Sequence, residues 1–397
     1  MVRLGRIAWT LLPALCLLLA CSGPGKIATQ LEISLAEPEI SAEAGSVFVR
    51  VASNTSWTLE IVPAVEWATL NADSGSGDRN SVILSCQSNP DETARSLSVV
   101  ATASDGKLTS SVTFRQRGRV APPSGGNEGS GSAVATDKWL ELPATSASDG
   151  YDYFCHWVDV DGKAVRNWSF YWNAGARVSM WVAYPLCSLY LGSQSRSDAW
   201  GYDPLLPAVR QQNVSGGYRV GNNGFYDRGH QLPSADRTAS YAMNATTFYG
   251  TNMTPQNGTL NQNIWAQLEN KVRDWSKLSD TLYVVTGCTV DGATHYVLDR
   301  SDAKITVPTG YFKAVIRYKK DSTVGYSGYM GAAFWFDHEG VTWSGKKFSK
   351  EQALSIEALE RKLGYTLFVN LPERVGTRTA AQIKSEDPAT MTWWWNN

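Results

Sequence analysis

The sequence predicts two folded units, an all-β sandwich followed by a larger α+β domain, and three observations support this division. The chain has 397 residues, enough for two or three domains at roughly 150 residues each. Short β-rich runs separated by turn residues fill positions 31–118, whereas strands mix with helices after position 135. A segment rich in glycine and serine, 119–135, separates the two patterns and cannot build a core.

The first unit, 31–118, contains five expected strands bounded by Gly, Asn, Asp and Pro clusters. These strands are 46–51, 57–61, 81–86, 97–101 and 108–114. The Ser56-Trp57 and Trp67-Ala68 pairs and the closing run 112–116 resemble a BACON-type domain, and that resemblance implies contact with glycans. Both tryptophans also suit a hydrophobic core, which we favour, and the unit would then act as a spacer.

The second unit, 136–397, combines apolar strands with two helical runs. Strands are expected at 178–184, 281–286, 312–318 and 329–336, and helices at 260–278 and 350–363. In the first helix the expected buried stripe is Ile264, Leu268, Val272 and Trp275, which lie within about 80° of one another. Asn261, Glu269 and Arg273 follow the edge of this stripe, where they can face a cleft. A Glu269–Arg273 surface pair is the plainer alternative.

Composition excludes a disordered chain and a strongly basic one. Hydrophobic residues make up 43% and charged residues 18%, and the net charge is −1. Residues 22–118 carry 7 basic and 11 acidic groups, a charge of −4, whereas 119–397 carries +1. Any site for a polyanion must therefore be local. The 16 tryptophans and 17 tyrosines fit either large cores or stacking platforms for sugars or bases.

The amino terminus predicts export. Arg3 and Arg6 precede an apolar run, 11–20, of about half the length that a membrane-spanning helix needs, so 1–20 is expected to be a signal peptide. Leu18-Leu19-Ala20-Cys21 resembles the lipobox of bacterial lipoproteins, which implies a lipid anchor on Cys21 and a short tether, 21–30. An ordinary signal peptide is the alternative. The expected location is the bacterial cell envelope, at the outer membrane, with the membrane contacted through the lipid alone.

Four cysteines remain after the predicted anchor, in a setting that permits disulfides. They are Cys86, Cys155, Cys187 and Cys288, which allow three pairings, and we favour Cys155–Cys187 because both flank one strand-rich segment. Their spacing does not match a zinc site.

The chemistry-bearing segment is Tyr226-Asp227-Arg228-Gly229-His230, in a chain with only four histidines. A histidine can accept a proton near neutral pH, an adjacent arginine can hold a phosphate oxygen, and glycine permits a tight backbone. His230 as a hydrogen-bonded loop residue is the alternative for this motif taken alone.

Further blocks lie on both sides of this motif in a fixed order, and together they resemble the DNA/RNA non-specific endonuclease family. The blocks are 252–256, Asn261 with Glu269 eight residues later, and Arg273; 181–184, Arg196 and 203–204 upstream; and 283–287, 307–308, 311–313 and 371–372 downstream. The resemblance runs from about 175 to 375 and implies a ββα-metal fold that cleaves DNA and RNA.

The resemblance also implies a role for each matched residue. His230 would be the general base and Asn261 the protein ligand of Mg²⁺, with Mn²⁺ as a substitute and 5′-phosphate products. Glu269 would hold water bound to the metal. Arg196 and Arg228 would lie at the scissile phosphate. Arg273 and Asn252 would contact substrate or order the site loop.

Several segments have no counterpart in the family pattern. Residues 136–177 and Trp393-Trp394-Trp395 are either packing additions, which we favour, or a strip that stacks on bases. His156, His295 and His338 match no motif and are expected to be structural or surface groups. The sequence thus predicts an exported, lipid-anchored, Mg²⁺-dependent nuclease. The alternatives are a non-enzymatic, glycan-binding surface lipoprotein, and a nuclease of the same fold that is restricted to RNA or to single strands. The oligomeric state is left open.

Overall fold

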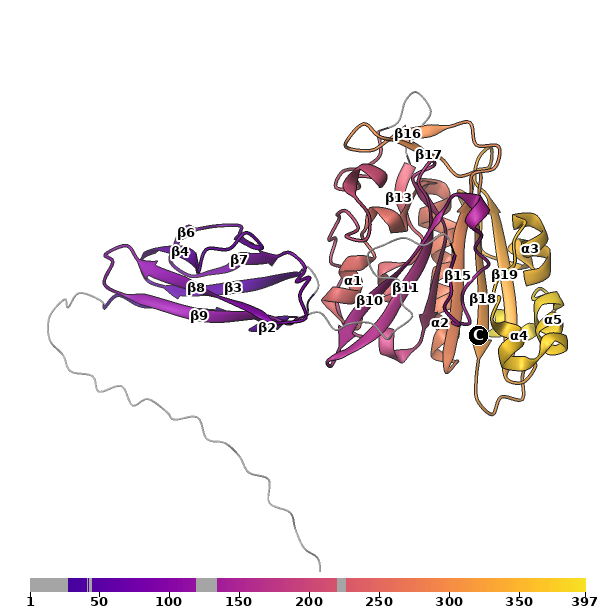
Figure 1. Cartoon of the computed structure of the whole chain (residues 1–397), viewed down its shortest axis with the longest axis horizontal. Coiled ribbons are helices and arrows are strands. Elements are labelled where there is room, and N and C mark those ends of the chain that lie inside the picture. Colours follow the sequence, from indigo (N-terminus) through magenta and orange to yellow (C-terminus); the bar gives the residue numbers. More distant parts are fainter. Residues whose placement is uncertain (1–27, 41, 43–44, 119–133, 220–225) are drawn as a thin grey trace, which may run out of the picture.

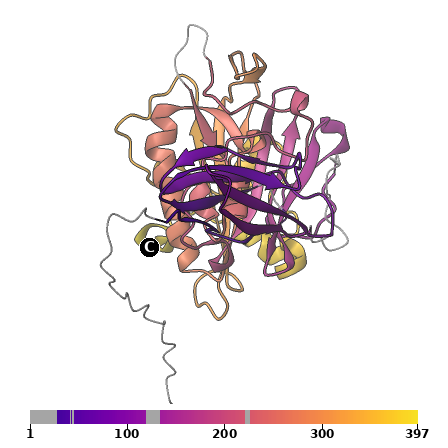
Figure 2. The same cartoon turned by 90° about the vertical axis from the view of Figure 1, so that its left-hand side faces the viewer.

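The computed structural model describes residues 28–40, 42, 45–118, 134–219 and 226–397. The predicted signal peptide, Cys21 and most of the linker lie outside these residues. The described chain forms a β-rich unit and a larger mixed domain, coloured indigo to violet and magenta to yellow in Figure 1. Figure 2, a view from the side of the β-rich unit, shows its strands in front of the larger domain.

The amino-terminal unit is built from two sheets that enclose one core. One sheet has the order β1-β3-β7-β5 and the other β2-β9-β8-β4-β6. The strands are β1 Leu31–Leu35, β2 Glu39–Ile40, β3 Gly45–Ser53, β4 Ser56–Val62, β5 Ala68–Leu70, β6 Ser74–Ser76, β7 Arg79–Cys86, β8 Arg95–Ala103 and β9 Thr109–Gln116. Buried and exposed residues alternate along β3 and β8, as expected when one face of each strand packs inward. The five predicted strands are thus present, together with four short ones.

The two tryptophans of this unit belong to its packing. Trp57 is 2% exposed, and its Nε1 donates to the Gly77 carbonyl at 2.9 Å. Trp67 is partly buried, and the Arg95 guanidinium covers its ring at 4.1 Å from the centroid. Neither ring is an open platform for a sugar, so the expectation that they are core residues holds.

The larger domain is organised around a seven-stranded antiparallel sheet with the order β10-β11-β12-β15-β18-β19-β20. Its strands are β10 Asp152–Val160, β11 Lys163–Asn173, β12 Val178–Leu186, β15 Thr281–Thr289, β18 Gly310–Tyr318, β19 Tyr329–Asp337 and β20 Ala353–Leu354. Nearly all of β12 and β18 is buried, which fits a sheet that is covered on both faces. Strands β10 and β11 both lie in the segment 136–177, which therefore extends one edge of the sheet.

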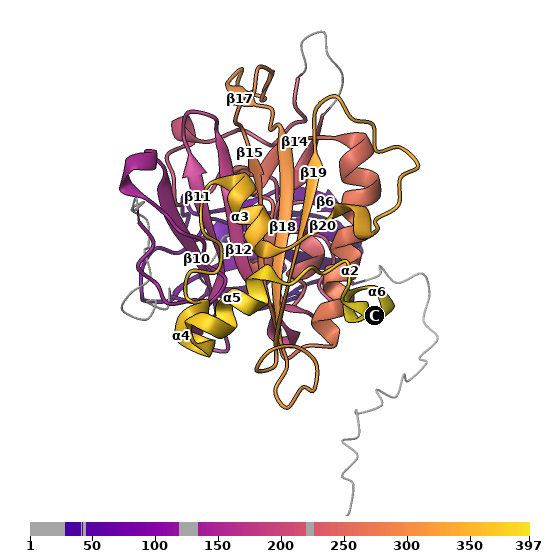
Figure 3. The ribbon, with the colours of Figure 1, turned by 90° about the vertical axis from the view of Figure 1, so that its right-hand side faces the viewer.

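Helices cover both faces of this sheet. The helices are α1 Tyr241–Thr246, α2 Ala266–Lys277, α3 Ile356–Leu363, α4 Leu371–Val375, α5 Thr377–Ser385 and α6 Thr392–Asn396. Figure 3 shows α3 and α5 in front of the sheet, with α4 beside α5 at the lower left, and Figure 1 shows α1 and α2 on the opposite side. The remaining strands form two separate two-stranded sheets, β13 Tyr226–His230 with β14 Met253–Asn257, and β16 Tyr296–Leu298 with β17 Lys304–Thr306. The short 3-10 turns are η1 Ala147–Asp149, η2 Ser188–Tyr190, η3 Ala208–Arg210, η4 Ser234–Asp236, η5 Gly250–Asn252 and η7 Lys350–Gln352, and η6 Leu260–Trp265 is a π-helix.

The predicted helix over 350–363 is wrong in its first half. Residues Lys350–Gln352 form the turn η7 and Ala353–Leu354 join the sheet as β20, so α3 begins only at Ile356. The Ser355 side chain accepts from the Ala358 backbone N–H and so caps α3 at that point. The other predicted helix is confirmed, because Ile264, Leu268, Val272 and Trp275 are all 1% exposed or less.

The tryptophans near the carboxyl end are packing residues, as expected. Trp394 is fully buried against Trp275, with ring centroids 4.8 Å apart, and its backbone carbonyl accepts from Trp275 Nε1 at 3.1 Å. The Trp395 ring lies 5.5 Å from that of Phe348.

The favoured Cys155–Cys187 disulfide is wrong, since all four cysteines of the described residues are free thiols. Cys155 is buried in the main core, whereas Cys187 packs with Val158 and Met243 in a separate cluster. Among the described residues, the structure contains no helix whose length and hydrophobicity would let it cross a membrane.

Candidate active site

The predicted site residues gather on a ββα unit made of β13, β14 and the continuous η6–α2 helix. The two strands pair antiparallel, with His230 opposite Met253 and Asp227 opposite Gln256. Gly229 is required by a close approach between the strands, because a Cβ there would lie 2.4 Å from Oε1 and 2.6 Å from Cβ of Gln256. The small residue of the motif therefore lets the β13 backbone lie against a buried side chain of β14.

His230 ends β13 and lies among aromatic rings. Its ring centroid lies 5.6 Å from that of Trp200 and 5.0 Å from that of Phe248, both edge-to-face. Burial lowers the pKa of His230 to about 3, with a further lowering from the positive charges of Arg196 and Arg228 and a small opposing effect of a hydrogen bond to the Arg228 backbone. The imidazole is therefore neutral at physiological pH. Its Nε2 is shielded from solvent and has no hydrogen-bond partner within the described part of the chain.

The two arginines flank this histidine and stack on the same rings. The Arg228 guanidinium lies 3.5 Å from the Trp200 ring centroid and donates to the Val214 carbonyl at 2.6 Å. The Arg196 guanidinium lies 4.6 Å from the Phe248 centroid, pairs with Asp198 at 2.8 Å and donates to Ser234 Oγ at 3.2 Å. Stacking fixes the plane of each cation while its edge can still donate to an anion.

Asn261 lies on η6, and its side-chain amide donates to the carboxylate of Asp227 on β13. Asp227 Oδ2 accepts from Asn261 Nδ2 at 2.9 Å and from Gln262 Nε2 at 2.8 Å. Oδ1 is the Asn261 atom that can bind a cation, and the hydrogen bond from Nδ2 to Asp227 fixes the orientation of the amide. An amide oxygen beside a carboxylate is a hard donor set, which fits Mg²⁺. No group of three or more His, Cys, Asp or Glu suited to a metal occurs in the described ranges.

Glu269 lies two turns further along the helix, in a buried network of charges. Burial raises the pKa of Glu269 to about 7, although the nearby Lys313 cation lowers it. Lys313 is fully buried on β18, with its Nζ 4.9 Å from the Trp265 ring centroid. Arg273 pairs with Asp236 at 2.8 Å, and Asp236 also accepts from the Tyr184 hydroxyl at 2.9 Å. This network joins the helix to the sheet and to the loop that follows His230.

A family model for DNA/RNA non-specific endonucleases matches residues 163–374, more than half of the chain. The chain belongs to the DNA/RNA non-specific endonuclease family. The match begins inside the segment 136–177, so the expectation that this segment has no family counterpart is wrong for residues 163–177. It is 37% identical over 145 residues to a nuclease from Nostoc sp., a match that covers 36% of this chain and 50% of the relative. It is 30% identical over 180 residues to the mitochondrial nuclease of Saccharomyces cerevisiae, covering 43% and 53%. A nuclease from Serratia marcescens is 28% identical over 207 residues, covering 51% and 73%. The chain thus spans about half the length of the first two relatives.

Two residues expected from the family resemblance, Asn252 and Arg273, make their contacts with other groups of the protein. Asn252 is fully buried, and its amide donates to the Leu232 and Thr247 carbonyls at 2.8 Å and accepts from the Leu232 N–H at 2.9 Å. These hydrogen bonds order the loop after His230. They leave no free amide atom on Asn252 for contact with substrate, which is its other expected role. Arg273 is 19% exposed and donates to Asp236 and Asn270, so its observed contacts are structural.

The three histidines outside the family motif are structural or surface groups, as expected. His156 is buried and contacts Asp203 at 2.8 Å, and His338 is buried between the Pro308 carbonyl and the Asn257 N–H. His295 lies at the surface and pairs with Glu339 at 2.6 Å.

Sequence reasoning missed four residues of the site, Trp200, Phe248, Asp236 and Lys313. Lys313 carried a usable signal, since it is a single charge inside the strand run Tyr311-Phe312-Lys313-Ala314-Val315. Trp200 and Phe248 had none, because they lie 30 and 18 residues from His230 and meet it only through the fold.

Proposed function

We propose that this chain hydrolyses phosphodiester bonds of DNA and RNA, with Mg²⁺ as its cofactor and 5′-phosphate ends on its products. The observation that carries the proposal is the environment of His230. A neutral imidazole with an unpartnered Nε2 is placed between two arginines whose charges suit a phosphate. Base and anion-binding groups thus meet at one point.

In the proposed reaction, Arg196 and Arg228 hold the phosphate while His230 accepts a proton from water at Nε2. The water oxygen forms a bond to phosphorus as the bond from phosphorus to the 3′ oxygen breaks, and the leaving 3′ oxygen takes up a proton from solvent to become a hydroxyl. An anionic phosphate between the arginines offsets their charges, which raises the pKa of His230 and makes it a stronger base once substrate is bound. Because the chemistry centres on phosphate, the base sequence is left mostly unread.

Asn261 would hold the metal through Oδ1, with Asp227 fixing its amide. Mg²⁺ bound there would stabilise the charge that develops on the phosphate and on the leaving 3′ oxygen, and Mn²⁺ is expected to substitute because it takes the same oxygen ligands. Glu269 would accept hydrogen bonds from water in the site.

The deciding experiment incubates the purified protein with plasmid DNA and with RNA, in Mg²⁺, in Mn²⁺ and with a chelator. We expect both polymers to be cut only with metal and the new ends to carry 5′-phosphate. His230→Ala is expected to lose at least about 10²-fold in rate. His295→Ala is the matched control, since His295 is at the surface and paired with Glu339. Full activity of His230→Ala would overturn the mechanism.

The proposed cellular place rests on residues 1–21. A charged start, a short apolar run and Leu-Leu-Ala-Cys support export and lipidation at Cys21. Cys21→Ala should move the protein from the membrane fraction to the soluble one, and protease treatment of intact cells would report which face it occupies. Retention of the variant in membranes would contradict the anchor.

A further inference from the structure

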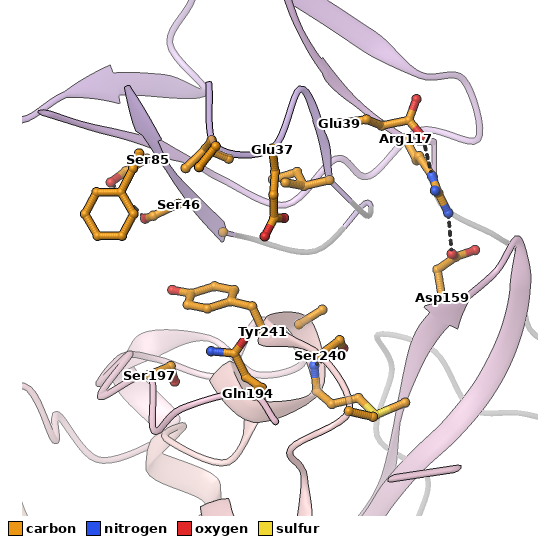
Figure 4. A pocket seen from close by; sticks show the side chains of 18 of the residues that line it. Glu37, Glu39, Ser46, Ser85, Arg117, Asp159, Gln194, Ser197, Ser240 and Tyr241 are labelled. Atoms are coloured by element: carbon orange, nitrogen blue, oxygen red, sulfur yellow. Dashed lines mark hydrogen bonds and ion pairs between the residues drawn. The ribbon is translucent and has the colours of Figure 1, made fainter. Parts of the chain in front are cut away.

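A cleft of about 920 Å³ lies between the amino-terminal unit and the larger domain. Figure 4 shows Glu37 and Ser46 on its upper wall and Tyr241, Gln194 and Ser197 on its lower wall. Tyr241 begins α1 and reaches the other unit, since its Cε1 is 3.7 Å from the point where a Cβ on Gly45 would stand. Two regions far apart in the sequence therefore form one cleft.

An ion-pair chain closes one side of this cleft and joins its two walls. Arg117 pairs with Glu39 of its own unit at 2.6 Å and with Asp159 of the larger domain at 3.0 Å, as Figure 4 shows. The Asp159 side chain is only 5% exposed, so this contact is well shielded on the side of the larger domain. The Arg117 guanidinium therefore links the two walls of the cleft on this side.

The cleft lies next to the candidate active site, and Arg196 belongs to both. This residue lines the cleft and also stacks on Phe248, whose ring contacts His230. A nucleic-acid strand whose phosphate is held by Arg196 can therefore extend from the site toward the cleft.

The chemistry of the walls suits bases better than phosphates. Phe48 is an aromatic ring that is 56% exposed, and Tyr241 offers a second, half-buried ring. Exposed aromatic rings stack on bases of any sequence. Outside the Arg117 chain, the charged groups of the lining are the exposed carboxylates Glu37 and Asp161, together with Arg196. Carboxylates accept hydrogen bonds from the amino groups of bases, and they repel a phosphate backbone.

We propose that this cleft is a base-binding subsite for a single-stranded flank of the substrate, and that the acidic groups disfavour the second backbone of a duplex. The inference rests on the proposed function. It gives the amino-terminal unit a direct part in substrate choice: the full chain cleaves single strands in preference to duplexes.

The test compares kcat/KM on a single-stranded oligonucleotide, the same sequence as a duplex, and a small chromogenic phosphodiester too short to reach the cleft. Phe48→Ala, alone and with Tyr241→Ala, is expected to lower cleavage of the single strand about tenfold for each lost stack and to leave the small diester unchanged. Tyr296→Ala is the control, because Tyr296 is 52% exposed but lies outside the cleft. Because Phe48 is exposed, its substitution should not impair folding.

The acidic wall has a separate test. Glu37→Gln with Asp161→Asn should raise cleavage of the duplex several-fold and narrow the preference for single strands. Unchanged cleavage of all substrates by the Phe48 and Glu37 variants, or a parallel loss on the small diester, would overturn the subsite. If the unmodified protein cleaves no nucleic acid, the proposed function fails. If it cleaves and the variants behave like it, only the subsite fails.

Discussion

The guanidinium of Arg228 lies 3.5 Å from the centroid of the Trp200 ring, so the indole sets the plane of a cation that neighbours His230. The same guanidinium donates to the Val214 carbonyl, which fixes it at a second point. Burial lowers the pKa of Arg228, so its position depends on neighbours that compensate for lost water.

Replacement of Trp200 tests this relationship. Trp200→Leu should lower kcat/KM about tenfold, because an arginine released from a stack is misplaced for phosphate, and Trp200→Phe should recover part of the loss because it restores an aromatic face. Steady-state kinetics measure the effect. Trp335→Leu, which removes a stack with Lys362, is the matched control. Equal kinetics for the Leu and Phe variants would show that the ring face is not what matters.

Gly229 gives a prediction about stability. Gly229→Ala places a methyl group 2.4 Å from Gln256 Oε1, and this overpacking is expected to cost about 1–3 kcal/mol of unfolding free energy. Gly258→Ala, directly after the end of β14, is the control, since the nearest atom to its added methyl group would be 3.5 Å away. Urea unfolding of both variants provides the comparison, and equal midpoints would argue against the close approach.

The parts of the site that lie close together in sequence could be predicted from it, and the parts that meet by folding could not. His230, Asn261 and Glu269 belong to local motifs with fixed spacing, and the buried stripe from Ile264 to Trp275 follows from helix periodicity. The aromatic surroundings of His230 come instead from two distant loops. Their contribution to the pKa of His230, through burial, has no sequence signature.

The errors have a similar origin. The run 350–363 has the composition of a helix, but Ala353–Leu354 pair with β19, and this pairing overrides the local propensity. Helix α3 begins only after Ser355, which caps it. A Cys155–Cys187 disulfide is predicted because the two residues flank one strand-rich segment, yet they pack in different clusters. Local sequence does not report which sheet edge or which core a residue joins.

Asp227 gives a prediction about metal affinity. Its Oδ2 accepts from both Asn261 and Gln262, so Asp227→Ala frees the amide that would bind the cation. The Mg²⁺ concentration for half-maximal activity should rise about 10–100-fold, with a smaller change in the rate at saturating metal. Gln262→Ala keeps the bond to Asn261 and should change little. If Asp227→Ala keeps the normal Mg²⁺ requirement, the result would contradict Asn261 as the residue that binds the metal.

His230 gives a prediction about stability and pH. Its pKa is about 3 in the folded chain and near the ordinary value of 6.5 in the unfolded one, so between these values the unfolded state binds more protons. Stability is therefore lost as pH falls from about 6.5 toward 3. His230→Gln should show a flatter dependence of unfolding free energy on pH across that window. Urea unfolding at several pH values tests this, and parallel curves for both proteins would contradict it.

Lys313 gives a prediction about the pH dependence of activity. Its buried Nζ has no hydrogen-bond partner among the described residues, and its charge lowers the pKa of Glu269, which burial holds near 7. Asp236 raises that pKa and Arg273 lowers it. Both residues are unchanged in the variant, so their effects on the pKa of Glu269 stay the same. Lys313→Met removes the cation at similar volume, and the pKa of Glu269 should rise further, leaving its carboxyl protonated at neutral pH. The acid limb of the pH–rate profile should then move to higher pH, with activity regained in alkaline buffer. Lys319→Met, at a surface pair with Asp280, is the control. A profile that keeps its shape while the rate falls at every pH would show that Lys313 supports only the packing of the helix on the sheet.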